Sequence, residues 1–274
     1  MALWDDPEVA GRGTGPDFVE ALARGLDVLT CFDDLHREMT LAEVAAATDL
    51  ARPTARRLLL TLAELGYVRV ADGRFALTPA VLRLGSAYAS SLGLWEMARP
   101  HLEELVAQTH ESSSMSQLDG SDIVYVARVA VPKIIALRVD IGTRFPAVVA
   151  SQGKVLLAAL SPEELDRVLA EPTRSGVAAP PVDRTALGEE LAVVRERGWA
   201  LADEELARGI RSVAVPVRDG GGEVRAAMNV TVHAAETSVA TLTEEYLPLL
   251  VQAAGRVADD WAAWHSRPQV ELHP

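Results

Sequence analysis

Cysteine, lysine and long apolar runs are all scarce in this chain of 274 residues. The single cysteine, Cys31, cannot form an intrachain disulfide, which favours a reducing compartment. It lies in an apolar helical pattern, so we expect a buried and unreactive thiol. No apolar run approaches the roughly 18 residues that span a bilayer, and the acidic start is the wrong chemistry for a signal peptide. We therefore expect a soluble cytoplasmic protein that contacts no membrane.

Patterns of catalysis and metal binding are missing as well. The six histidines are scattered without the spacing of metal ligands. No Ser/His/Asp or Cys/His set has a recognisable spacing, and the glycines at 220–222 fall in a predicted hairpin turn rather than in a phosphate-binding loop. The sequence therefore predicts no catalytic residue, no metal site and no cofactor.

Positive charge is in the minority, because 26 basic residues face 39 acidic ones and the formal net charge is −13. This balance argues against a protein that binds polyanions without selectivity. A protein that reads DNA sequence needs only one basic surface, however. Between Leu50 and Ala76, five arginines stand against two acidic residues, so this stretch is the candidate surface.

The first eighty residues have the pattern of a winged helix-turn-helix. Apolar spacing predicts helices over 17–32, capped by Asp17, over 40–48 and over 52–65. The dipeptide Asp72-Gly73 then predicts a tight hairpin. Three helices, a short turn between the second and third, and a hairpin are the parts that this DNA-binding motif needs.

The helix over 52–65 has two different faces. The inward face is predicted to hold Ala55, Leu58, Leu59, Leu62 and Leu65, and the outward face Pro53, Arg56, Arg57, Leu60 and Glu64. Arginine can bond guanine or phosphate, and an apolar side chain can meet a thymine methyl group in the major groove. We predict DNA contacts from Arg52, Pro53, Thr54, Arg56, Arg57, Leu60, Arg69 and Arg74. The alternative is a winged helix that binds protein, as a pure interaction module or as the dimerisation domain of a methyltransferase-like enzyme.

The rest of the chain reads as a mixed helical and stranded domain. Predicted helices cover 79–93, 94–109, 151–160, 161–171, 184–198 and 240–264, and predicted strands cover 112–119, 122–131, 134–142, 199–205, 211–219 and 224–233. Strands joined by hairpins and interspersed with helices favour a central antiparallel sheet with helices on its faces. The predicted fold class is α+β. Its parts are a disordered tail 1–16, a winged helix-turn-helix 17–78, a linker helix 79–93, an effector-binding domain 94–265 and a tail 266–274.

Several segments resemble the IclR family of bacterial transcriptional regulators. "FVEALARGLDVLTCF", "TLAEVAAATDLARPTARRLLLTLAELGYV" and "FALTPAVLRLGSAYASSL" resemble its N-terminal domain. "HESSSMSQLDGSDIVYVARV", "GTRFPAVVASQGKVLLA", "DEELARGIRSVAVPVRD" and "AAMNVTVH" continue the resemblance, which runs from Phe18 to Trp261. The chain looks closest to the branch that controls protocatechuate, 4-hydroxybenzoate and β-ketoadipate catabolism. One departure is Ala51, where relatives often carry a serine N-cap; its loss costs about 1 kcal/mol.

The resemblance implies a repressor or activator with a GAF-like effector domain. Such a protein binds a double-stranded operator and a small carboxylate effector, an aromatic acid or a dicarboxylic catabolite, and assembles as a homodimer or dimer of dimers. In the family, positions matching Ser212 and Asp203 line or border the effector pocket. We expect Asp203 to be structural if the effector is anionic.

Two stretches can be read independently as an effector site. Ser151, Gln152 and Gly153 open a predicted helix, whose N-terminal N–H groups suit a carboxylate, and Gly153 permits close approach of a ligand. The alternative is an ordinary cap, with Ser151 as the N-cap. Asn229 and Thr231 share one face of a strand, and a ligand can satisfy them if they are buried; the alternative is a solvent-facing edge. The predicted effector set is Ser151, Gln152, Gly153, Ser212, Asn229 and Thr231.

Overall fold

The structure is a computed structural model that describes residues 17–33, 35–84, 94–132, 139–177 and 181–265. The chain divides into two compact units, Met1–Leu92 and Gly93–Pro274. Both predicted tails and most of the predicted linker helix lie outside the described residues. No helix within the described ranges is long and apolar enough to span a bilayer.

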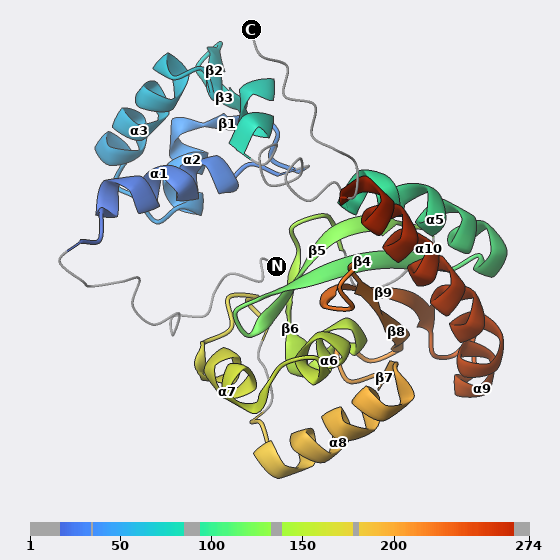
Figure 1. The fold of residues 1–274 in the computed structure, drawn as a ribbon. Coiled ribbons are helices and arrows are strands. Elements are labelled where there is room, and N and C mark those ends of the chain that lie inside the picture. The colour runs from blue at the N-terminus through green and yellow to red at the C-terminus, as the bar shows by residue number, and fades with distance from the viewer. Residues whose placement is uncertain (1–16, 34, 85–93, 133–138, 178–180, 266–274) are drawn as a thin grey trace, which may run out of the picture. The chain divides into compact units, whose positions relative to one another are not determined.

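The first unit has the predicted helices and hairpin (Figure 1). Its elements are α1 (Glu20–Thr30), β1 (Met39–Thr40), α2 (Leu41–Ala47), α3 (Arg52–Glu64), β2 (Val68–Ala71) and β3 (Arg74–Leu77), followed by a 3-10 turn at Pro79–Val81. The three strands form an antiparallel sheet in the order β1-β3-β2. The core of this unit contains Val28, Leu29, Met39, Val44, Leu59, Leu62, Val68 and Phe75.

Local chemistry explains where these elements begin and turn. Thr40 and Glu43 form a reciprocal capping box at the start of α2. The turn between β2 and β3 has positive φ at Asp72 (50°) and Gly73 (75°), as a two-residue hairpin of the I′ type requires. The predicted cap by Asp17 is wrong, because α1 begins only at Glu20 and its N-cap, Val19, makes no side-chain cap bond.

The sequence did not predict β1. It lies in a stretch read as a polar break, and two residues are too short to show an alternating pattern. Pairing of Met39 with Phe75 on β3 buries both side chains, so β1 is specified by a distant strand.

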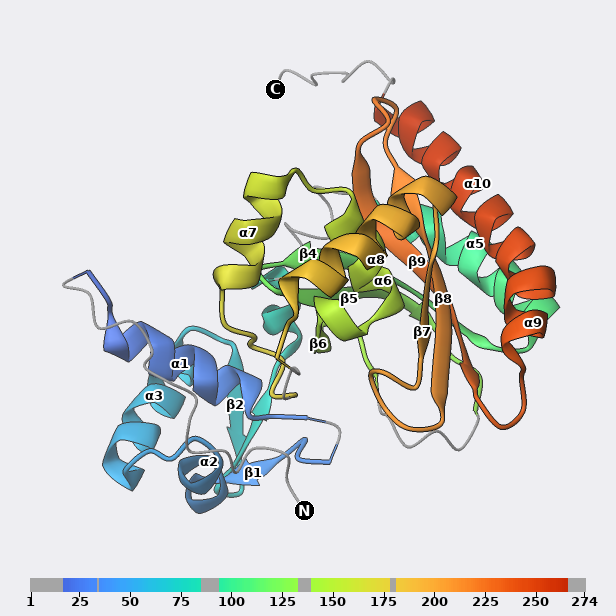
Figure 2. The ribbon, with the colours of Figure 1, turned by 90° about the horizontal axis from the view of Figure 1, so that it is seen from below.

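The second unit is built on the predicted antiparallel sheet, whose six strands have the order β6-β5-β4-β9-β8-β7 (Figure 2). The strands are β4 (Ser112–Asp119), β5 (Asp122–Val129), β6 (Arg144–Pro146), β7 (Ala200–Asp203), β8 (Ile210–Arg218) and β9 (Val224–His233). The predicted strand over 134–142 falls largely outside the described residues, and 139–142 form no strand. On the side away from β4, β5 pairs instead with the short strand β6.

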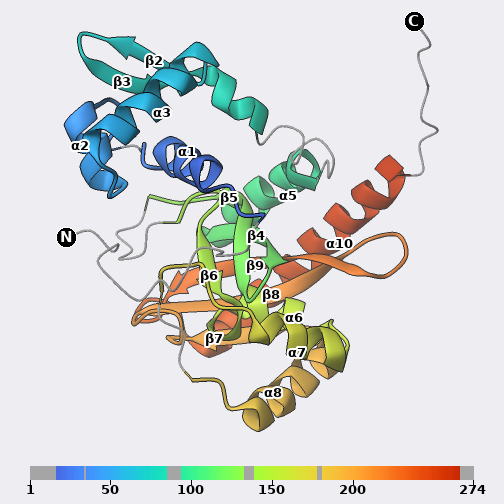
Figure 3. The ribbon, with the colours of Figure 1, turned by 90° about the vertical axis from the view of Figure 1, so that its left-hand side faces the viewer.

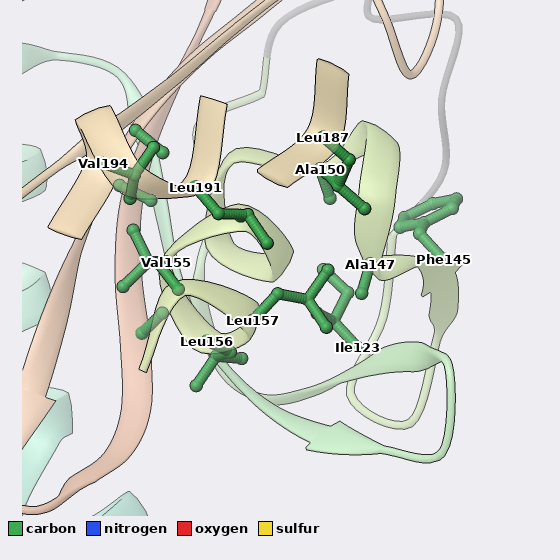
Figure 4. Packing of buried hydrophobic residues seen from close by; sticks show 14 of the residues in the cluster. Ile123, Phe145, Ala147, Ala150, Val155, Leu156, Leu157, Leu187, Leu191 and Val194 are labelled. Atoms are coloured by element: carbon green, nitrogen blue, oxygen red, sulfur yellow. The ribbon is translucent and has the colours of Figure 1, made fainter. Parts of the chain in front are cut away.

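Helices cover both faces of this sheet (Figure 3). On one face lie α5 (Leu94–Thr109) and α10 (Leu247–His265), which pack together; α9 (Val239–Thr241) and a π-helical turn at Leu242–Tyr246 lead into α10. On the other lie α6 (Ser151–Ala158), α7 (Pro162–Ala170) and α8 (Arg184–Arg197). Figure 4 shows α6 between the sheet and α8, with Val155, Leu157 and Leu191 in one buried cluster. The N-terminus of α6 is therefore held against the sheet.

Candidate functional site

The outward face of α3 is the candidate DNA-binding surface. Pro53, Arg56, Arg57 and Glu64 are exposed, and Leu60 keeps 42% of its surface in solvent. Inward, Ala55 and Leu59 are fully buried and Leu62 nearly so, while Leu58 is half-buried. Leu65 was predicted to point inward, but it is 58% exposed because it caps α3 after the last turn.

The start of α3 follows the expectation for an alanine cap. The helix begins at Arg52, with Ala51 as an N-cap that makes no side-chain bond and Pro53 in the first turn. Thr54 is half-buried beside them. Arg52, Arg56 and Arg57 form no ion pair or side-chain hydrogen bond with any residue that the structure describes. Their charges are available to a partner.

The two hairpin arginines lie in a different environment. Arg69 Nη2 donates to Glu38 Oε1 at 2.7 Å. Arg74 Nη1 donates to the Glu38 carbonyl at 3.0 Å and lies 3.8 Å from Glu43 Oε2. Both arginines are exposed, yet acidic residues of the same unit already hold them.

A pocket of the second unit opens between the sheet and the start of α6. It holds about 450 Å³ of empty space, counted out to its open mouth. Its lining residues are Tyr125, Arg128, Val139, Ala150, Ser151, Gln152, Leu206, Ile210, Ser212, Asn229 and Thr231.

Strand pairing explains how the polar lining comes together. Arg128, Ser114 and Asn229 lie opposite one another on β5, β4 and β9, so their side chains share a face. In the same way Thr231 lies opposite Ser212 on β8. These rows place the pocket over the middle of the sheet.

A β-bulge brings Tyr125 to the same face as Arg128. Tyr125 pairs with Ser116 and Ala127 with Met115, so the residue between them, Val126, has no partner on β4. One extra residue reverses the alternation of side chains along a strand. Tyr125 and Arg128, three residues apart, can therefore both line the pocket.

Arg128 is the one charged residue among the described residues of the lining. Its Nη1 donates to Ser114 Oγ at 3.1 Å, and it forms no ion pair with any carboxylate in the described part of the chain. Burial lowers the pKa of Arg128 and raises the pKa of Tyr125 to about 12. Asp140 stabilises the charge of Arg128 without forming an ion pair with it. The pocket thus offers a half-buried cation that has no ion-pair partner among the described residues, which suits an anionic ligand.

Five of the six predicted effector residues line this pocket. Ser151 Oγ and Ser212 Oγ lie 2.7 Å apart. The alternative of Ser151 as an ordinary N-cap is wrong, because Ala150 is the N-cap of α6 and Ser151 bonds Ser212 instead. Gln152 Nε2 donates to two backbone carbonyls, while its Oε1 is buried and has no hydrogen-bond partner among the described residues.

Asn229 and Thr231 are satisfied by the protein itself. Asn229 Oδ1 accepts from the Ser114 N–H at 3.2 Å, and Nδ2 donates to Thr231 Oγ1 at 3.0 Å. The alternative of a solvent-facing edge is wrong, because β9 lies between β4 and β8 and Asn229 is buried. Asp203 forms an ion pair with Arg211 at 2.6 Å, in line with a structural role.

Glycine is needed at position 153 for a different reason from the one predicted. Gly153 does not line the pocket, and a Cβ built on it would lie 2.0 Å from the Ala147 carbonyl oxygen. The close approach is that of the turn before α6 rather than that of a ligand.

Sequence reasoning missed Tyr125, Arg128, Val139, Ala150, Leu206 and Ile210 as lining residues. The stretch "VYVARV" contains an arginine in an otherwise apolar strand, which was a usable signal. Strict alternation puts Tyr125 and Arg128 on opposite faces, however, and the bulge was not visible in one sequence.

A winged helix joined to a unit with a polar ligand pocket defines a DNA-binding transcriptional regulator that responds to a small molecule. Models of the IclR helix-turn-helix domain and of the C-terminal part of IclR-type bacterial transcriptional regulators match residues 21–72 and 86–259. The chain belongs to the IclR family.

Two curated relatives cover most of the chain. The Pca regulon regulatory protein of Pseudomonas putida is 39% identical over 242 residues, which are 87% of this chain and 83% of that protein. The p-hydroxybenzoate hydroxylase transcriptional activator of Acinetobacter baylyi is 34% identical over 247 residues, or 88% of this chain and 91% of its own.

Two solved structures share the fold. A transcriptional regulator from Rhodococcus sp. RHA1 is 46% identical, with a TM-score of 0.76 over 90% of this chain and 100% of its own. An IclR homologue from Microbacterium hydrocarbonoxydans, crystallised with 4-hydroxybenzoate, has a TM-score of 0.75 over 89% of this chain and 99% of its own. That protein is 24% identical, so it supports the fold alone.

Proposed function

We propose that this regulator controls genes of aromatic-acid catabolism and that its effector is a hydroxylated aromatic carboxylate. The observation that carries the proposal is Arg128, a cation in a pocket whose described lining residues include no carboxylate. A bound carboxylate supplies the missing counter-charge and can form charge-assisted hydrogen bonds with the guanidinium. The names of the Pseudomonas and Acinetobacter relatives point to the same chemistry.

Gln152 is the reason for expecting a hydroxyl group on the effector. Because Nε2 of Gln152 is committed to the carbonyls of Ser114 and Ala227, the amide orientation is fixed and Oε1 is left as an acceptor. A buried acceptor without a donor costs free energy. A ligand hydroxyl that donates to it removes that cost, so 4-hydroxybenzoate is expected to bind more tightly than benzoate.

Isothermal titration calorimetry tests this effector class directly. We expect binding of 4-hydroxybenzoate or 3,4-dihydroxybenzoate, at least tenfold weaker binding of benzoate, and no binding of benzamide. Equal affinity for benzoate and benzamide would show that no cation holds the carboxylate. Benzoate binding as tightly as its hydroxylated forms would remove the role given to Gln152.

DNA recognition is proposed for the exposed arginines of α3. Arg52, Arg56 and Arg57 have no partner among the described residues, and Leu60 lies exposed on the same helix. Pro53 and Thr54 set the entry of the helix towards the DNA phosphates. Arg69 and Arg74 can reach the DNA backbone only by exchanging their contacts with Glu38. A family whose members bind DNA through this domain makes the major groove the expected target.

The double variant Arg56→Ala/Arg57→Ala tests the assignment by gel shift on the DNA upstream of the gene. We expect at least a hundredfold loss of affinity with unchanged folding and oligomeric state. Arg218→Ala/Arg225→Ala, in the second unit, removes the same charge and serves as the control. Unchanged affinity in the α3 variant would contradict DNA recognition and favour a protein-binding winged helix.

Assembly as a homodimer or dimer of dimers is part of the proposal. Phe18, Leu22 and Leu26 recur every four residues at α1 and are 39%, 64% and 51% exposed. A second copy that covers this stripe would explain why it is apolar, and paired DNA-binding units match a pseudo-palindromic operator. Leu22→Glu/Leu26→Glu is expected to lower the mass measured by sedimentation; an unchanged mass would move the interface elsewhere.

We propose that the chain acts on DNA in the bacterial cytoplasm, and by binding rather than by catalysis.

A further inference from the structure

Lys154 is a buried cation that the effector pocket does not use directly. Its side chain, on α6, is only 1% exposed. Its Nζ donates to Glu190 Oε1 at 2.6 Å and to Glu205 at 2.6 and 2.7 Å. Both glutamate side chains are 41% exposed, so the two carboxylates meet the same ammonium in closely matched surroundings.

The two carboxylates come from different parts of the second unit. Glu190 lies on α8, which packs against α6. Glu205 lies in the segment 204–209 between β7 and β8, and the next residue, Leu206, lines the pocket. Ser151 and Gln152, at the start of α6, line the same pocket. The bond between Lys154 and Glu205 therefore joins two walls of the pocket.

Two bonds at the ends of the segment hold its shape. Glu204 Oε2 accepts from the Gly209 N–H at 2.8 Å, and the Glu204 N–H donates to the Ile210 carbonyl at 2.9 Å. Both bonds close the segment on itself. The ion pair of Glu205 with Lys154 ties its middle to α6, beside the packing of Leu206 against the buried cluster that contains α6 residues.

Lys154 is a fixed point for this contact. The start of α6 cannot shift easily, because the backbone of the adjacent Gly153 lies against Ala147. An ammonium buried this deeply also cannot exchange its carboxylates for water without a large cost. Glu205 must come to Lys154, and Leu206 is placed as a result.

We propose that Lys154 and Glu205 are positioning residues that place Leu206 and so set the shape of the effector pocket, although neither lines it. This inference rests on the proposed effector function of the pocket. Glu190 neutralises the same ammonium but holds no pocket wall. The prediction is that loss of Glu205 affects effector binding and loss of Glu190 does not.

The experiment compares Glu205→Leu with Glu190→Leu in the full chain. Each change removes one carboxylate from the same ammonium, so a purely structural role lowers the melting temperature in both. Hydrogen exchange of the ligand-free protein should show at least tenfold faster exchange over 204–210 in Glu205→Leu and less than twofold change in Glu190→Leu. Calorimetry with 4-hydroxybenzoate should show at least tenfold weaker binding in Glu205→Leu and less than twofold change in Glu190→Leu.

The two measurements separate the possible failures. Equal exchange over 204–210 in both variants would overturn the positioning role, whatever the effector is. Faster exchange in Glu205→Leu with unchanged affinity would show that the segment does not shape the pocket, and would overturn the inference too. If the wild-type protein does not bind 4-hydroxybenzoate, the proposed effector is wrong, and the exchange comparison still decides the positioning role.

Discussion

Replacing Arg128 with leucine should separate ligand binding from folding in this protein. The guanidinium is half-buried, donates to one serine hydroxyl, Ser114 Oγ, and pairs with no carboxylate among the described residues. In the free protein its charge is compensated only in part, by Asp140 without an ion pair, and burial lowers the pKa of Arg128. Arg128→Leu is expected to leave the free protein as stable as the wild type, or slightly more stable, because a desolvated cation is removed.

The effect on the ligand is large by comparison. Removing one partner of a hydrogen-bonded charge pair costs roughly 2–5 kcal/mol, and about 3 kcal/mol corresponds to roughly a hundredfold in Kd. At a ligand concentration of 100 Kd the wild type gains about 2.7 kcal/mol, whereas a hundredfold weaker variant gains about 0.4 kcal/mol. For a unit of this size each kcal/mol raises the melting temperature by about 2–4 °C. The ligand-induced rise should fall from about 5–11 °C to about 1–2 °C.

A thermal-shift titration with 4-hydroxybenzoate measures this difference. Arg225→Leu is the matched control, because it removes one positive charge from a residue that pairs with Asp219 and does not line the pocket. The control should keep the full ligand-induced rise. A full rise in Arg128→Leu as well would refute the reasoning that this cation holds the carboxylate. A large loss of stability in ligand-free Arg128→Leu would show that the guanidinium is structural.

Three further predictions follow from single contacts. In chemical denaturation, Gly153→Ala should destabilise the protein by at least about 3 kcal/mol, because the new Cβ would lie 2.0 Å from a backbone carbonyl oxygen. Gly188→Ala, on α8 with open space around it, should instead stabilise the protein by about 0.5–1 kcal/mol. Equal effects of the two changes would contradict the packing account. Cys31, which was expected to be buried, is half-buried. This partial burial raises the pKa of Cys31 to about 11, so at pH 8 its alkylation should be about a hundredfold slower than that of a free thiol; a normal rate would contradict that effect of burial. Glu38→Gln should raise operator affinity a few-fold in fluorescence anisotropy and steepen its salt dependence, because Arg69 is released to reach a phosphate; lower affinity would show that the pair orients the hairpin for DNA.

The elements of the first unit could be predicted because their signals are local. The capping box at Thr40 and Glu43 and the Asp72-Gly73 turn each depend on a few neighbouring residues, and the turn appears where the dipeptide predicts it. β1 could not be predicted, because its pairing partner Phe75 lies more than thirty residues away. Leu65 fits the apolar period of α3, but the helix ends one residue earlier and the side chain turns to solvent.

The pocket was half predictable for a related reason. Four lining residues could be predicted, because they are polar residues at the start of a helix or on one face of a strand: Ser151, Gln152, Asn229 and Thr231. Arg128 could not, since its face depends on a bulge that shifts the register between β4 and β5. A single sequence carries no mark of where a strand skips a residue, so the charge on which the proposed ligand preference rests was missed.

Charge pairing changes how the acidic composition should be understood. By count, the five arginines between Leu50 and Ala76 are equivalent. In the structure Arg69 and Arg74 are held by acidic residues near the hairpin, and the three arginines of α3 are not held by any described residue. In a chain with 39 acidic residues, a carboxylate that binds an arginine withdraws it from competition for phosphate. If the proposed DNA contacts are right, the acidic excess concentrates them on α3, and loss of Glu38 should widen that surface to the hairpin.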